Sequence, residues 1–78
     1  MNENTAIHRG IEAALASLHQ MLVAADYEVF TAREHIRKGE QNTAIGAAMP
    51  VKEALEQSLA VYHAILAMHR FNLKGNSL

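Results

Sequence analysis

Histidines are the residues of this sequence whose type and spacing bear most directly on chemistry, because imidazole binds metal ions and transfers protons near neutral pH. His8 and Glu12 are four residues apart and therefore share one face of a helix. In a helical hairpin that closes near residue 40, His69 returns to the level of Glu12. The three side chains form a candidate site for a divalent metal ion. A hydrogen-bonded core histidine is the alternative interpretation of His69.

Other catalytic chemistry lacks the residues that it needs. The sequence has no cysteine, which excludes thiolate zinc sites and cysteine nucleophiles. Ser17 and Ser58 lack the Gly-x-Ser-x-Gly setting of a nucleophile elbow, and Asp26 is the only aspartate available to orient a histidine. The glycines are too scattered for a phosphate-binding loop. We therefore expect no enzyme, and no cofactor other than the divalent metal considered above.

The element that positions the first two metal candidates is a long N-terminal helix. Apolar residues recur there at alternating steps of four and three, which is the pattern of an amphipathic helix with a coiled-coil seam. We expect this helix to run from about residue 5 to about residue 38, with Gly10 marking either close packing or a later start. The predicted seam consists of Ile11, Leu15, Leu18, Leu22, Ala25, Val29, Ala32 and Ile36.

A turn and a second helix follow. Arg37 and Lys38 before Gly39 are typical of a helix end, so a turn is expected over about 39–42. A connection this short makes the next helix return antiparallel, over about 43–73. Pro50 either begins that helix or kinks it, and the small Gly46 four residues earlier favours the kink. The second predicted seam consists of Leu55, Leu59, Tyr62, Leu66, His69 and Leu73.

The size of the chain predicts self-association. Its 78 residues form one helical-hairpin domain, 1–78, which is near the lower limit for a stable core. Each helix also carries apolar residues outside its seam, and one partner helix cannot cover both faces. The predicted fold is therefore all-α: an antiparallel two-helix hairpin that assembles as a homodimer or higher oligomer into a four-helix or larger bundle.

Apolar residues outside the first seam suggest a surface for a partner protein. The candidates are Met21, Val23, Tyr27 and Phe30. They either dock a helix or groove of another protein or are buried entirely within the homo-oligomer. The function expected from these features is that of a small, non-enzymatic protein-interaction module or regulator.

A basic cluster near the turn gives a further alternative, RNA binding through Arg33, Arg37 and Lys38. A dimer of helical hairpins resembles in architecture the small plasmid RNA-binding proteins of the Rop type, which implies RNA as a ligand. No motif matches residue by residue. Acidic residues interspersed with the basic ones weaken the positive field, so a solvated helix end whose cations complement the helix dipole is the favoured interpretation.

Charge and hydropathy set the expected location. The formal net charge is -1, so no global field attracts nucleic acid or an acidic membrane. The N-terminal residues lack the basic start and apolar run of a secretory signal. The longest nearly uninterrupted apolar stretch, 59–68, is far shorter than the roughly 20 residues that span a bilayer. We expect a cytoplasmic protein without a membrane segment.

Overall fold

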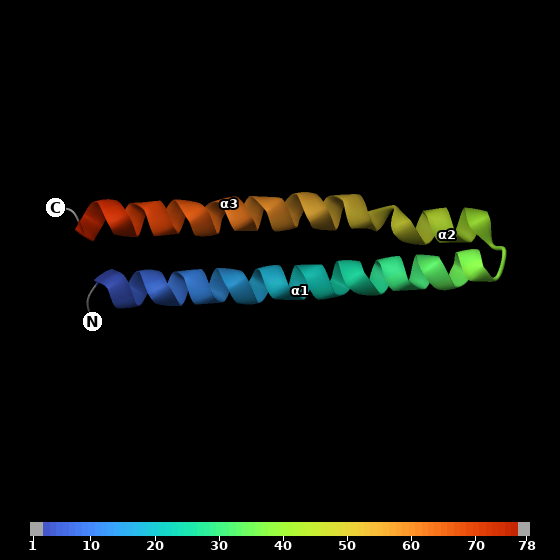
Figure 1. The fold of residues 1–78 in the computed structure, drawn as a ribbon, viewed down its shortest axis with the longest axis horizontal. Coiled ribbons are helices and arrows are strands. Elements are labelled where there is room, and N and C mark those ends of the chain that lie inside the picture. The colour runs from blue at the N-terminus through green and yellow to red at the C-terminus, as the bar shows by residue number, and fades with distance from the viewer. Residues whose placement is uncertain (1–2, 77–78) are drawn as a thin grey trace.

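The protein is a helical hairpin in a computed structural model that describes the backbone of residues 3–76 and the side chains of residues 5–71. Helix α1 spans Glu3–Arg37, α2 spans Gln41–Ala48 and α3 spans Pro50–Asn76. Figure 1 shows α1 along one side of the hairpin and α2 and α3 along the other, with both chain ends at the same tip. The molecule is a rod with extents of 60 × 17 × 12 Å. The all-helical class predicted from the sequence is confirmed.

The turn is closed by a glycine in the left-handed conformation. Gly39 has φ +78°, and the backbone N–H groups of Gly39 and Glu40 donate to the carbonyls of Ile36 and His35 at 3.0 Å each. These two bonds form a Schellman motif, which satisfies carbonyls that the end of α1 leaves without partners. α2 begins two residues later at Gln41, so the chain reverses within a few residues.

The second half of the hairpin is bent where α2 meets α3. Met49 still donates its backbone N–H to the carbonyl of Ile45 at 3.1 Å. Pro50, which follows, has no N–H to offer the carbonyl of Gly46. The helix is therefore interrupted at Met49 and begins again at Pro50. This arrangement agrees with the prediction of a kink.

Small residues bring the two sides of the hairpin together. Ala25, Ala44 and Ser58 expose only 4–6% of their surface. Gly10 lies inside α1, and a Cβ placed on it would stand 3.4 Å from the sulfur of Met68, so this glycine lies at the helix contact. The residues that are buried or half-buried along the contact define the hairpin seam. They are Ile7, Ile11, Ala14, Leu18, Met21, Ala25, Glu28, Ala32 and His35 on α1 and Ala44, Ala47, Val51, Ala54, Ser58, Val61, Ile65 and Met68 on α2 and α3.

The predicted seams were wrong in their rotational phase. On α1, Ile11, Leu18, Ala25 and Ala32 do belong to the hairpin seam, but the other four predicted members, Leu15, Leu22, Val29 and Ile36, are exposed. On α3, Leu55, Leu59, Tyr62 and His69 are exposed and only Leu66 is half-buried, whereas Leu73 lies outside the residues whose side chains are described. The stripe that forms the contact includes six alanines and Ser58, and such small residues allow the helices to approach closely.

The hairpin by itself has almost no apolar core. Within residues 5–71, the only buried hydrophobic residues are two alanines, and no large side chain is fully buried. Folding must offset the conformational entropy of the chain chiefly by burying apolar surface, and a pair of helices with an alanine seam buries little of it. None of the helices in the described part of the chain is long and apolar enough to span a membrane.

Candidate interaction surface

The leucine-rich stripes left out of the hairpin seam are the main surface feature of the molecule. On α1 the exposed residues are spaced seven apart, each directly following a seam position. α3 carries a corresponding row. We call these residues the broad apolar face, and each exposes between 46% and 54% of its surface. The face consists of Leu15, Leu22, Val29 and Ile36 on α1 and Leu55, Leu59 and Tyr62 on α3.

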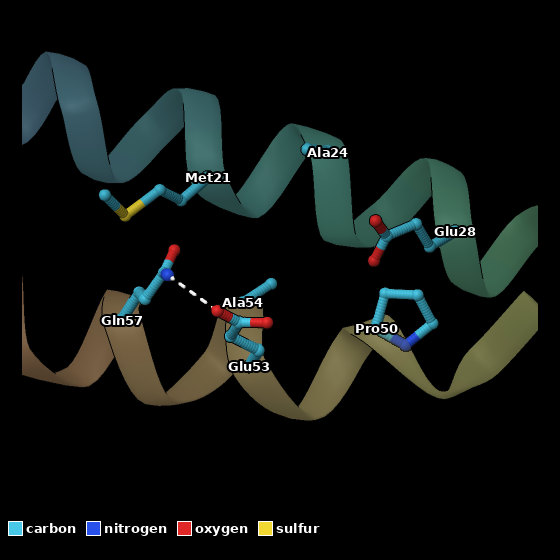
Figure 2. A pocket seen from close by; sticks show the side chains of 7 residues that line it. All are labelled: Met21, Ala24, Glu28, Pro50, Glu53, Ala54 and Gln57. Carbon is cyan, nitrogen blue, oxygen red and sulfur yellow. Dashed lines mark hydrogen bonds between the residues drawn. The ribbon is translucent and has the colours of Figure 1, made fainter.

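Both rows lie on the same side of the hairpin. The groove in Figure 2 is on the opposite side, where Ala24 and Gln57 flank the hairpin seam. Leu22 flanks the seam on the other edge of α1, and Leu55 flanks it on the other edge of α3, because residues that precede and follow a seam position point to opposite sides. The broad apolar face is therefore one continuous surface built from both sides of the hairpin.

Near the turn, this surface is hollowed into an open groove between α1 and α2. Arg33 is the only charged residue of its lining, to which α1 contributes Ile36 and α2 contributes Ile45. Ile45 is 58% exposed, so the broad apolar face continues onto α2. The other lining residues are Val29, Ala32, Ala44 and Ala48.

The opposite groove differs in chemistry. Figure 2 shows the carboxylate of Glu28 between α1 and the ring of Pro50, with Glu53 and Gln57 further along α3. Gln57 Nε2 donates to Glu53 Oε1 at 3.3 Å. Glu28 Oε2 is buried and has no hydrogen-bond partner, although Glu28 occupies a position in the hairpin seam. Nothing in the sequence pattern marked this carboxylate as a seam residue, because a glutamate interrupts the apolar periodicity.

The predicted interaction residues divide into two groups. Met21 is half-buried in the hairpin seam and lines the groove shown in Figure 2. Val23, Tyr27 and Phe30 are 54–69% exposed on the outside of α1, and we call them the outer patch. They follow one another at spacings of four and three residues, which places them on one face of the helix.

The predicted metal ligands are not gathered into a site within one hairpin. His8, Glu12 and His69 are all exposed, and among the side chains of residues 5–71 no group of three histidine, aspartate or glutamate residues is placed to hold a metal ion. His8 and His69 follow seam positions on α1 and α3, which places them on the side of the broad apolar face, toward the open end of the hairpin.

The predicted RNA-binding residues are all exposed near the turn. Arg37 lies 3.3 Å from Glu34, one turn earlier on the same helix, and this contact neutralises part of the cluster. Arg33 lines the groove between α1 and α2. Lys38 lies in the turn itself, beside Glu40. The basic residues are thus dispersed among carboxylates and do not form a continuous positive patch.

A hydrogen bond between a histidine and a glutamate side chain spans the turn. His35 Nδ1 donates to Glu40 Oε1 at 2.8 Å, while the backbone carbonyl of His35 accepts from the N–H of Glu40. This side-chain hydrogen bond lowers the pKa of the Glu40 carboxyl below its ordinary value of 4.5, and the charges of His35 and Lys38 add to that effect. The sequence pattern predicted the helix end and the turn here but not this hydrogen-bonded pair.

Comparison with known proteins gives no further guide to the site. The chain matches no protein-family model, no curated protein and no solved structure.

Proposed function

We propose that this chain is a non-enzymatic protein-interaction module that acts as a homodimeric four-helix bundle. The observation that supports the proposal is the contrast between the two sides of each helix. The hairpin seam includes seven alanine or serine residues and no large side chain that is fully buried, whereas the seven large residues of the broad apolar face stay about half exposed. A surface this rich in leucine is typical of an interface and not of a solvated face.

A second copy is the occupant that best suits this face. Residues at the seam and next to it make each helix apolar over a wide arc, which is the pattern of helices in a four-helix bundle. Completing the burial of a half-exposed leucine contributes about 1 kcal/mol, and seven such residues on each copy would supply the core that a single hairpin lacks. The outer patch stays outside this interface and is the surface that we assign to a partner protein.

The test of assembly is the molar mass by light scattering together with helicity on dilution. We expect a dimer at tens of micromolar, and loss of helical signal on dilution because folding is coupled to association. Leu22→Glu should abolish the dimer, since it places two charges in the core of the bundle. Gln20→Glu, a charge on the exposed opposite edge of α1, is the matched control and should leave the mass unchanged.

A monomer whose unfolding does not depend on concentration would refute this function. So would equal effects of Leu22→Glu and its control, because the broad apolar face would then be an ordinary solvated surface.

A further inference from the structure

The order of charges along α1 carries information about how the two copies are oriented. We propose that the second copy packs antiparallel, with α1 against α1 of the partner and the two turns at opposite ends of the bundle. This inference rests on the proposed dimer and adds its geometry. The residues concerned border the broad apolar face at intervals of seven: Glu12, His19, Asp26 and Arg33.

These four side chains are exposed, and the ion pairs within the described residues involve none of them. Their series begins with a carboxylate and ends with a guanidinium. An antiparallel α1 runs through the series in reverse, so that Glu12 meets the partner's Arg33 and Asp26 meets the partner's His19. Each of the four groups then has a complementary neighbour across the interface.

The alternative, with both turns at one end, gives a poorer match. A twofold axis along the rod would place α1 against α3 of the partner. Arg33 would then lie at the level of Ala48 and Ile45, which cannot accept a hydrogen bond from its guanidinium through their side chains. Lys52, which lies 3.8 Å from Glu56 and is 87% exposed, would come to the level of the partner's Asp26, so this arrangement offers a complementary charge to only one of the four residues.

The α1 row permits the antiparallel arrangement in part. Leu15 and Val29 are equally far from Leu22, so reversing the helix about Leu22 exchanges these two apolar positions, whereas Ile36 comes to the level of His8. Figure 2 shows Met21 beside Gln57 and Glu28 beside Pro50, so Leu22 lies at the level of the Leu55 end of the α3 row. The pairing of charges along α1 therefore carries the proposal.

Antiparallel packing has a consequence for the outer patch. Val23 and Phe30 lie on the outside of α1, Val23 at the height of Leu22 and Phe30 about two turns nearer the hairpin turn. With the two α1 helices adjacent, the outer patches of both copies lie side by side on one flank of the bundle. The dimer then offers a partner protein one composite apolar surface with twofold symmetry. Parallel packing would instead place the patches on opposite flanks.

The direct test is a distance between the two turns. The chain has no cysteine, so Gln41→Cys, at an exposed position, accepts one spin label per copy. Gln41 lies nearly 20 residues beyond Leu22, so antiparallel packing predicts a label separation of about 50 Å. Parallel packing would bring the labels within roughly 30 Å, because neighbouring helices of a bundle lie about 10 Å apart.

Charge reversal gives a second, independent readout. Arg33→Glu should raise the dimer dissociation constant about tenfold at low salt, because two attractive pairs become repulsive. Combining it with Glu12→Arg should restore the wild-type constant only if the two residues meet across the interface.

The outcomes separate the two proposals. A dimer with a short label distance, or a double variant weaker than Arg33→Glu alone, refutes the antiparallel arrangement and leaves the proposed function standing. A monomer by light scattering refutes both.

Discussion

Two glycines seven residues apart should respond in opposite ways to the same substitution. Gly39 has φ +78°, and a Cβ placed on it would meet nothing within 4 Å, so backbone conformation alone decides the outcome. An L-residue in the left-handed region costs roughly 1–2 kcal/mol. Gly46 also has free space around its Cβ, but it lies inside α2 without a positive φ. Alanine there stabilises a helix by about 1 kcal/mol.

We therefore expect Gly39→Ala to lower the free energy of unfolding by about 1 kcal/mol per protomer or somewhat more, and Gly46→Ala to raise it by about 0.5–1 kcal/mol. For a chain of this size, a change of 1 kcal/mol corresponds to a shift of about 4–8 °C in Tm. Urea and thermal unfolding followed by circular dichroism measure both values. All variants must be compared at one protein concentration, because association stabilises the folded state by mass action.

Gly39→Asn is the control for the turn, because asparagine tolerates the left-handed conformation better than alanine does. Its cost should fall between those of glycine and alanine. A neutral Gly39→Ala, or equal effects of the alanine and asparagine variants, would contradict the assignment of this turn to a left-handed glycine.

Three further changes follow from individual contacts. Glu28→Leu should raise the free energy of unfolding by about 1–3 kcal/mol in urea titrations, because it removes a buried carboxylate oxygen that lacks a hydrogen-bond partner. A loss of stability would mean that a second copy supplies a hydrogen bond to this carboxylate. Ser58→Ala should change the stability by less than about 0.5 kcal/mol, because the Ser58 hydroxyl only donates to the carbonyl of Ala54 in its own helix, whereas Ser58→Leu should cost about 1–3 kcal/mol by overpacking the seam. The pKa of Glu40 is lowered in the folded state, so its carboxylate stabilises the fold above the ordinary pKa of a glutamate, and this stabilisation is lost as the pH falls through the folded-state pKa. Glu40→Gln should therefore lower the free energy of unfolding at neutral pH and leave it unchanged at the most acidic pH. Parallel profiles of unfolding free energy against pH for variant and wild type would contradict the role of the His35 pair.

The sequence predicted the order of the helices and the position of the bend because helix-ending residues and apolar periodicity act locally. Gly39 after two basic residues predicted the helix end, and Pro50 after Gly46 predicted the bend, since each effect depends on backbone chemistry within a few residues. The phase of the hairpin seam could not be obtained in this way. Leu15 and Ala14 lie on adjacent stripes that are both apolar, and which stripe faces the other half of the hairpin depends on how closely the two backbones approach.

The exposure of the candidate residues could be predicted in part. Val23, Tyr27 and Phe30 were proposed as interaction residues because they lie outside the apolar stripe of α1, and all three are exposed; their contact with a partner stays a prediction. Met21 lies in the hairpin seam beside a groove, a position that follows only from the phase of that seam. Glu28 was missed entirely, since a carboxylate in a seam contradicts the pattern from which seams are inferred.

The meeting of both chain ends at one tip of the rod gives the fold a polarity. α1 begins and α3 ends at the tip opposite the turn (Figure 1), and the rod is 60 Å long. Any segment joined to either end of the chain would therefore emerge at the same tip and be held several nanometres from Gly39. A fluorescent protein or affinity tag attached at either terminus leaves the turn unobstructed, whereas an insertion at the turn leaves the termini free, so the two tips can be labelled independently of each other.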